Sequence, residues 1–537
     1  MQKLLKTCGM RGGVQSNSSL KQRIKRGFTI MELVIVIAVI AVLAAVLIPT
    51  FANVIDRANL SNDTGTVRNI NEALLADEVL NGKAETMGDA LRVAREAGYD
   101  IDKISPSTDG YIYAWDDKEN QFMLLENNDG DFSVYYPEGV QISAENTWVI
   151  ADDDNYADFQ REGYHIFQLA ESSEEVIDRL TSGAGGTGEV DYILLSENID
   201  MGDTTINLNS NLSNVTLDLN GNSLSVKSDA NAASGITVQS GATLTLANGT
   251  VKIDETTNDT AHAGLSVILG GSLTLDNVNL DTSEATGIFV QNEKNATEPT
   301  ELIINNSQIE ANAYCVGTNA NFENQLVNIS ITDSILNGNG ETALMINVPG
   351  ELNAANTTFI GGMQSVIVRG GGITATFNGC GFENNVTYNG SFGWKAGLNS
   401  ATGVWTGNRP LNKWDQGNCI PMACLTIGND EDNTGYACGT ADNELPTSVS
   451  LTNCMFEATG EDSAAGNHKY MTVYLEGSDE YTKINLNYDS ATAASIDGTG
   501  YGLVYGANVV INGAAMADNE SDCNRIYAAN LSARSDN

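Results

Sequence analysis

The apolar segment from Phe28 to Ile48 constrains this chain more than any other feature of its sequence. Glu32 is the one charged residue in this segment. At about 1.5 Å per residue, a helix of this length would extend roughly 30 Å, the thickness of a membrane's hydrocarbon core. The preceding residues are basic and would stay on the cytoplasmic side: Lys21, Arg23, Lys25 and Arg26. Residues 28–48 therefore predict a transmembrane helix. An ordinary signal anchor that tolerates one acid is the simpler alternative.

The residues around Gly27 form a specific motif. Basic residues are followed by Gly27 and Phe28, and Glu32 is the fifth residue after the glycine. This arrangement resembles the signal of type IV prepilins and pseudopilins. The resemblance implies that a prepilin peptidase cuts after Gly27 and methylates the new amine of Phe28. Pro49 matches the family's helix-bending proline.

The same resemblance gives Glu32 a role in assembly, in which its carboxylate pairs with the Phe28 amine of a neighbouring subunit. An ammonium and a carboxylate buried together compensate each other, whereas either one alone in lipid is costly. The resemblance is close over residues 25–51 and looser over 52–137. It implies a subunit that is membrane-anchored before assembly and then part of a pilus at the cell surface. Its partners would be the prepilin peptidase and other pilin subunits.

The composition agrees with an exported protein. The 69 acidic residues outnumber the 27 basic ones and give a net charge of −42. Nucleic acid would be repelled by this charge, so we expect no nucleic acid partner. Of the eight cysteines, Cys8 lies before Gly27, and the odd number that remains leaves at least one thiol outside any set of disulfides. The absence of a CxxC pair argues against a zinc site.

The residues after Pro49 predict the rest of a pilin-like domain, which spans 28–139. Weaker apolar periodicity continues the helix, with an interruption expected around 61–65 and a stop near Asn81-Gly82.

A short helix and a small antiparallel sheet should follow. Thr86, with Asp89 three residues later, resembles a capping box and predicts a helix that ends at Gly98. Alternating apolar residues predict strands at 111–115, 121–125 and 132–136.

Residues 140–189 are expected to be a transition and a cap. The acidic run 152–154 can bind calcium, but such runs are usually solvated, and we expect no cofactor. Residues 172–180 predict a short helix, and the glycine-rich stretch 182–188 predicts a flexible break.

From residue 190 onward one phrase recurs, apolar-x-apolar-x-(Asn, Asp or Gly)-x-x-apolar. Its copies begin at Leu217, Leu244, Leu273, Leu302, Ile329, Leu352, Ala375 and Val449. A second apolar strand recurs at Gly235, Leu265, Gly287, Leu344 and Val366. Short strands with a period of ~25 residues predict a parallel β-solenoid whose turn asparagines can stack as ladders. An antiparallel sandwich is the alternative, and a fixed period disfavours it.

The repeat pattern resembles that of right-handed parallel β-helix proteins of the pectate lyase-like group. The expected fold class is therefore α+β. An N-terminal transmembrane pilin helix with a small antiparallel sheet precedes a large all-β right-handed parallel β-helix at 190–537.

The repeat phase also predicts one disulfide. Cys380 and Cys454 each follow the turn position of their copy. If the two copies are adjacent rungs, their strands lie ~4.8 Å apart, within reach of a disulfide. We therefore predict a Cys380–Cys454 bridge.

The long gap before the last copy predicts an insertion at 387–447. It contains three tryptophans: Trp394, Trp405 and Trp414. They predict either an aromatic surface for a glycan, host or matrix protein ligand, or a small core of the insertion itself.

The sequence shows no clear catalytic set. A polysaccharide lyase needs a cationic base, and a hydrolase needs paired acids. Arg369, beside three glycines, is the best single candidate, and we expect no enzyme activity. We expect a minor or tip pilin-like subunit that displays a β-helix adhesion module. The alternatives are a surface-tethered polysaccharide lyase or hydrolase and a structural pseudopilin of a secretion or DNA-uptake system.

Overall fold

The structure, a computed structural model, describes residues 30–526 with gaps, the longest of which are 183–190, 385–397, 406–422 and 429–436. The chain divides into two compact units, residues 1–62 and 63–537, and each is described by itself. Helix α1 (Ile30–Asn81) begins in the first unit and ends in the second.

Helix α1 is continuous through residues 61–65, so the predicted interruption there is wrong. The predicted stop is confirmed, since Gly82 follows the last helical residue with a φ of 91° that favours glycine. Within the part of the chain that the structure describes, no helix combines the length and the apolar character needed to cross a membrane. The transmembrane helix predicted at 28–48 is thus not identified.

In the second unit, the end of α1 packs on an antiparallel sheet. Val67, Ile70 and Leu74 recur at helical spacing and are buried. The Asn71 side chain donates to the Phe122 carbonyl (2.9 Å) and accepts from the Phe122 N–H (2.6 Å). The sheet consists of β1 (Tyr111–Asp116), β2 (Gln121–Asn128) and β3 (Asp131–Tyr136), paired antiparallel in the order β1–β2–β3.

The predicted short helix is α2 (Met87–Glu96), and its capping box is confirmed. The Thr86 hydroxyl accepts from the Asp89 N–H (3.2 Å), and the Asp89 carboxylate accepts from the Thr86 N–H (2.9 Å). These two bonds satisfy donors that a helix N-terminus would otherwise leave unpaired.

The antiparallel sheet continues into a parallel one. The next strands are β4 (Thr147–Ala151), β5 (His165–Ala170), β6 (Asp191–Leu195) and β9 (Val215–Asp218). β1 pairs antiparallel with β4, and each later pair in the series is parallel. η1 (Ala144–Asn146) precedes β4, α3 (Tyr156–Glu162) lies between β4 and β5, and α4 (Ser173–Ser182) lies between β5 and β6. α4 confirms the helix predicted at 172–180. The ladder of hydrogen bonds thus crosses both predicted domain boundaries.

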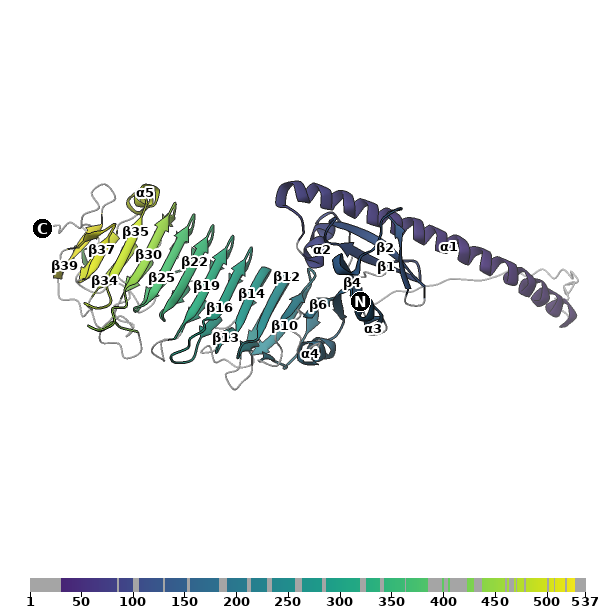
Figure 1. The fold of residues 1–537 in the computed structure, drawn as a ribbon, viewed down its shortest axis with the longest axis horizontal. Coiled ribbons are helices and arrows are strands. Elements are labelled where there is room, and N and C mark those ends of the chain that lie inside the picture. The colour runs from purple at the N-terminus through teal and green to yellow at the C-terminus, as the bar shows by residue number, and fades with distance from the viewer. Residues whose placement is uncertain are drawn as a thin grey trace, which may run out of the picture. The chain divides into compact units, whose positions relative to one another are not determined.

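Beyond β6, most of the described strands of the repeat region (residues 190–537) stack in parallel (Figure 1), and their pairings define three columns. The first column contains β9, the start of β12 (Thr243–Glu255), the start of β14 (Ser272–Thr282), β16 (Thr300–Asn305), β19 (Val327–Thr332), β22 (Gly350–Ala355), β25 (Ile373–Asn378), β30 (Thr447–Thr452), β35 (Ile484–Tyr488) and β37 (Val509–Ile511).

The second column contains β7 (Ile199–Asp200), β10 (Ser223–Ser228), the ends of β12 and β14, β17 (Gln308–Glu310), β20 (Ile335–Asn337), β23 (Thr358–Ile360), β26 (Gly381–Glu383) and β31 (Met455–Glu457). The third contains β8 (Ile206–Leu208), β11 (Ile236–Gln239), β13 (Ala263–Ile268), β15 (Thr286–Gln291), β18 (Tyr314–Thr318), β21 (Thr342–Ile346), β24 (Gln364–Arg369), β29 (Ala423–Gly428), β34 (Met471–Gly477) and β36 (Gly502–Gly506).

One strand from each column makes a rung, and the parallel pairings fit the predicted parallel β-helix. The remaining described elements are β27 (Leu398–Asn399), β28 (Val404–Trp405), β32 (Glu461–Asp462), β33 (His468–Lys469), α5 (Ser490–Thr499), β38 (Ala514–Ala515) and β39 (Asn519–Ile526). β38 and β39 pair antiparallel with β37 and β36.

The predicted repeat register is confirmed from Leu244 onward, but the predicted position of the first copy, at Leu217, is wrong. Leu273 pairs with Leu244, and Val449 pairs with Ala375. Leu244, however, pairs with Val215 rather than with Leu217. The turn after β9 is longer than its equivalents, and this shifted the alignment of the first copy.

The insertion predicted at 387–447 is also corrected. β29 lies inside it and pairs in parallel with β24 and β34, so the rung continues through this stretch. β29 keeps the apolar pattern of the third column, since Leu425 pairs with Val366 and Ile427 with Val368.

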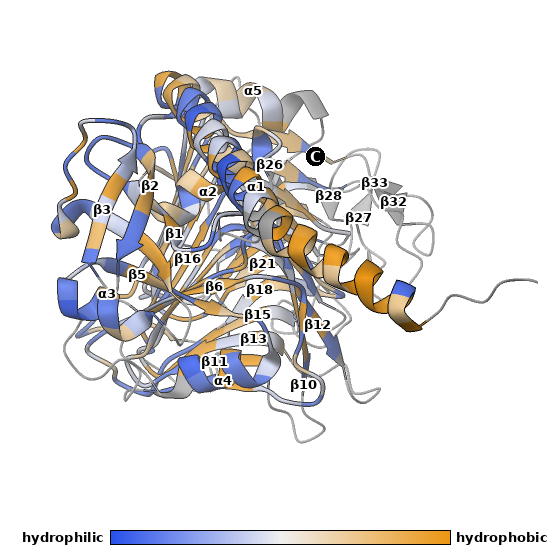
Figure 2. Ribbon diagram, turned by 90° about the vertical axis from the view of Figure 1, so that its right-hand side faces the viewer, coloured by the Kyte–Doolittle hydropathy of each residue, from blue (hydrophilic) through white to orange (hydrophobic). Residues whose placement is uncertain are grey.

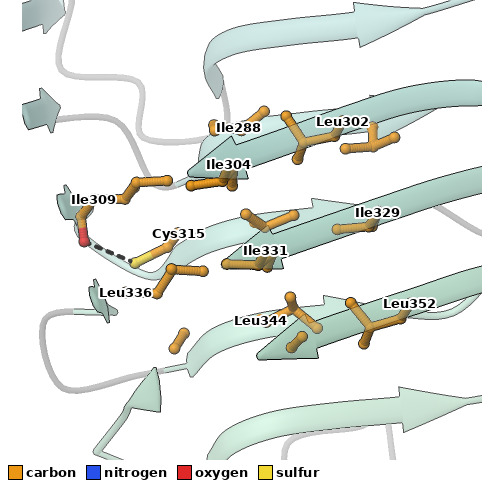
Figure 3. Packing of buried hydrophobic residues seen from close by; sticks show 14 of the residues in the cluster. Ile288, Leu302, Ile304, Ile309, Cys315, Ile329, Ile331, Leu336, Leu344 and Leu352 are labelled. Carbon is orange, nitrogen blue, oxygen red and sulfur yellow. Dashed lines mark hydrogen bonds between the residues drawn. The ribbon is translucent and has the colours of Figure 1, made fainter. Parts of the chain in front are cut away.

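Inward-facing aliphatic side chains form the core of the repeat region (Figure 3). Ile304 and Ile331 lie one above the other on neighbouring rungs, because each strand pairs in register with the next. Farther along, the rings of Phe382 and Phe456 stack with centroids 4.8 Å apart. Burial of this continuous apolar column stabilises rungs that could not be stable alone.

The turn asparagines form the predicted ladder. Asn248, Asn277 and Asn306 all have positive φ values, which asparagine tolerates better than most residues. Asn277 donates to the Asn248 side chain (3.0 Å), and Asn306 donates to that of Asn277 (3.2 Å). The ladder therefore fixes the corner between the first two columns.

Helix α2 lies against the first rungs through Gly88. A Cβ at Gly88 would overlap the carboxylate of Asp218, so the contact requires glycine. Asp218 is buried and accepts from the Asn248 side chain (2.9 Å) and the Asn220 N–H (2.7 Å). Burial raises the pKa of Asp218 to about 6, although both hydrogen bonds and the charge of Arg95 oppose the shift.

This pKa predicts a pH dependence of stability. Because the folded-state pKa exceeds that of an unfolded aspartate, the stabilisation is complete below about pH 4 and is lost as pH rises through about 6. Asp218→Asn should therefore gain about 3 kcal/mol in unfolding free energy relative to the wild type between about pH 4 and pH 7. Urea denaturation at both pH values measures the difference, and parallel profiles would contradict the assignment.

Candidate functional site

The first half of α1 exposes apolar side chains on all sides. Ile30 is 83% exposed and Ile48 66% exposed. Figure 2 shows the predominantly hydrophobic colour of this part of α1. Glu32 lies in the first helical turn. A helix that is apolar all around is normally covered by lipid or by other helices. Chemically, this segment is suited to contact with other apolar surfaces.

The structure places some of the predicted processing and assembly residues. Gly27 and Phe28 lie outside the described residues. Pro49 lies within α1, which continues past it. Glu32 lies near the start of the apolar segment, and its pairing with the Phe28 amine of a neighbouring subunit stays a prediction.

Comparison with known proteins agrees with this N-terminal segment. Residues 22–48 match the family model described as the prokaryotic N-terminal methylation motif. Two type IV major fimbrial proteins FimA of Dichelobacter nodosus are each 42% identical to the chain over 57 residues, which is 10% of this chain and 36% of theirs. The chain thus spans about a third of the length of these relatives. No solved structure matches. The chain has the N-terminus of a type IV pilin.

The predicted aromatic surface falls mostly outside the described residues, where Trp394 and Trp414 lie. Trp405 belongs to β28, and it pairs with Leu398 of β27. The acidic run 152–154 also lies outside the described residues. Among the residues that are described, no group of three or more His, Cys, Asp or Glu side chains is arranged to hold a metal ion.

Cys380 and Cys454 lie on adjacent rungs, as predicted, but the predicted disulfide is not formed. The flanking pairs Asn378–Thr452 and Gly381–Met455 set this register. Both cysteines are buried free thiols.

A different interaction explains this pair of cysteines. The Cys454 thiol donates to the carbonyl two residues before it, that of Thr452 (3.4 Å). On earlier rungs the hydroxyls of Ser307 and Ser334 make the same bond (2.7 Å each). The thiols therefore replace hydroxyls in a buried stack beside the asparagine ladder.

The thiol assignment predicts low reactivity. Burial raises the pKa of Cys454 to about 12 and also raises the pKa of Cys380, so both stay protonated at neutral pH. Iodoacetamide at about pH 8 should label both only after unfolding, as mass spectrometry of the peptides would show. Cys438, which is less buried, serves as the internal control that should react in the folded chain. Recovery of a peptide that links Cys380 to Cys454 would contradict the assignment.

The sequence did not reveal a buried polar row around Arg369. Register places Arg369, Gly428 and Glu476 side by side on β24, β29 and β34. Arg369 is 4% and Glu476 3% exposed, and the Tyr474 hydroxyl donates to Glu476 (2.7 Å). Gly428, between them in the register, has no side chain. Recognition of β29 and β34 as repeat strands would have revealed it.

Proposed function

We propose that this chain is a type IV pilin-like subunit, minor or at the tip, that displays a parallel β-helix at the cell surface. A prepilin peptidase would cleave it after Gly27, and the membrane would hold the segment 28–48 before assembly. Other pilin subunits would then cover the first half of α1. The observation that carries this proposal is the exposed apolar surface of that helix, together with its match to the methylation motif.

The proposed role of the repeat region is adhesion to a glycan or a host or matrix protein. This role is supported by the way in which the repeat region is joined to the antiparallel sheet. The ladder from β4 through β5 and β6 into β9 ties the repeat region to the antiparallel sheet by backbone hydrogen bonds. Such a connection holds a long module in a fixed orientation better than a flexible linker would. In this proposal the β-helix winds in the right-handed sense.

We propose binding without cleavage and without a cofactor. The row around Arg369 is the one observation that favours a polysaccharide-cleaving alternative. Arg369 and Glu476 are almost fully buried, and buried charges of opposite sign in one row more often have a structural role. A structural pseudopilin of a secretion or DNA-uptake system would need no ligand-binding repeat region, and the acidic chain disfavours contact with DNA.

Processing predicts a defined new N-terminus. In cells that contain a prepilin peptidase, the mature chain should begin at Phe28, and Gly27→Leu should abolish cleavage because a side chain would enter the peptidase site. Intact-mass measurement of the purified chain distinguishes the two forms. Gly13→Leu, a glycine substitution within the leader, is the matched control and should be cleaved normally. Cleavage of Gly27→Leu at the same bond would contradict the proposal.

Assembly should depend on the carboxylate of Glu32. Glu32→Gln should be processed normally but should reach the sheared filament fraction at least about tenfold less, because an unpaired ammonium in an apolar surrounding is costly. Immunoblotting of membrane and filament fractions measures the distribution. Glu72→Gln, on the exposed face of the same helix, should assemble like the wild type. Equal recovery of both variants in filaments would show that Glu32 does not act in assembly.

A further inference from the structure

A polar groove lies between α2 and the first rungs of the repeat region. Its volume is about 430 Å³, within the range of small-molecule sites. Arg92, Arg95 and Glu96 of α2 form one wall. The floor comes from successive rungs, on which Asn277 and Asn306 belong to the asparagine ladder.

The floor offers a row of uncharged hydrogen-bonding groups. Thr250, Asn279 and Gln308 occupy equivalent positions on three successive rungs and also line the groove. The spacing between neighbouring rungs is ~4.8 Å. A ligand that lies along the groove would therefore meet hydroxyl and amide groups at regular intervals.

The wall is held in place before any ligand arrives. Arg95 donates to the side chain of Asn220, which in turn donates to the Leu195 carbonyl (3.1 Å). A Cβ at Gly221 would come within 3.2 Å of the Arg95 Nε, so glycine permits this approach. Gly88 fixes the other end of α2 on Asp218. A preorganised wall lowers the entropic cost of binding.

The charge of the groove differs from that of the chain. Two arginines and one glutamate line it, whereas the whole chain has a net charge of −42. Arg92 is 28% exposed and forms an ion pair with Glu96 (2.9 Å). An anionic ligand that binds Arg92 more strongly than Glu96 does could displace Glu96 from this pair. Arginine binds carboxylate and sulfate-like anions through paired N–H groups, and amide side chains suit hydroxyl groups.

From these observations we propose that the groove binds an acidic sugar, with its anionic group at Arg92 and its hydroxyl groups over the asparagine ladder. The inference rests on the proposed display of the repeat region, since only an exported site would meet extracellular glycans. The shared chemistry is an anion on a polyhydroxylated ring, whether the anion is a carboxylate or a sulfate.

The test is a binding measurement with the full chain purified in detergent. Isothermal titration with 3′-sialyllactose and with lactose compares the same sugar with and without its carboxylated residue. A sulfated heparin disaccharide provides the second anion. We expect an acidic sugar to bind at least tenfold more tightly than lactose, and the tighter of the two identifies the preferred anion.

Variants locate the site. Arg92→Gln should weaken binding about tenfold, and Glu96→Gln should strengthen it several-fold, because the competing carboxylate is removed. Arg161→Gln is the matched control, since Arg161 forms an exposed ion pair with Asp158 on α3 and does not line the groove. Thermal unfolding confirms that the variants are folded.

The proposal is overturned if neither acidic sugar binds more tightly than lactose, or if Arg92→Gln and Arg161→Gln bind equally. Recovery of Arg92→Gln in sheared filaments keeps the two proposals separate. For the unsubstituted chain, filament assembly without sugar binding would refute the groove alone, and sugar binding without filament assembly would refute the pilin role alone.

Discussion

The structure depends on a ladder of backbone hydrogen bonds that does not stop where the repeat begins. β4, β5, β6 and β9 pair in parallel, one after another, and β1 attaches the antiparallel strands to the same sheet. Each described rung satisfies the backbone groups of the next, so the strands inside the described ladder have no open edge. At the far end β38 folds back on β37, and β39 pairs antiparallel with β36, which protects those edges from a further rung.

Two side-chain stacks at one corner keep the rungs in register. The asparagine ladder uses residues that tolerate positive φ, and the next position carries hydroxyls or thiols that donate back to the chain. Gly379 interrupts the ladder, and there a Cβ would lie 2.8 Å from the Asn356 side-chain oxygen. The thiols of Cys380 and Cys454 thus form hydrogen bonds within the turns, as the hydroxyls do on other rungs. Because the two cysteines occupy equivalent positions in the repeat, the sequence pattern predicted a disulfide between them.

Local patterns predicted much of the fold. The capping box of α2 and the strand that begins at Leu273 each follow from a few neighbouring residues. Errors arose where one rung departs from the average. The longer turn after β9 displaced the first copy, and β29 was hidden in a stretch read as one insertion.

The candidate groove could not have been predicted from local sequence. Arg92 and Asn277 are far apart in the chain, and the packing of Gly88 on Asp218, together with the Arg95–Asn220 hydrogen bond, brings α2 to the first rungs. The row that contains Arg369 and Glu476 could not be predicted from local sequence either, because it depends on the register of three strands. By contrast, the motif at Gly27 and Glu32 is contiguous, and the comparisons support it directly.

We propose that α1 carries the repeat region on a filament. Electron microscopy of sheared filaments, with gold-labelled antibodies against residues 243–383, tests it most directly. We expect gold on filaments, sparse along the shaft or concentrated at tips, and none on filaments from cells that lack the gene. Labelling confined to membrane fragments or to soluble protein, with bare filaments beside them, would contradict it.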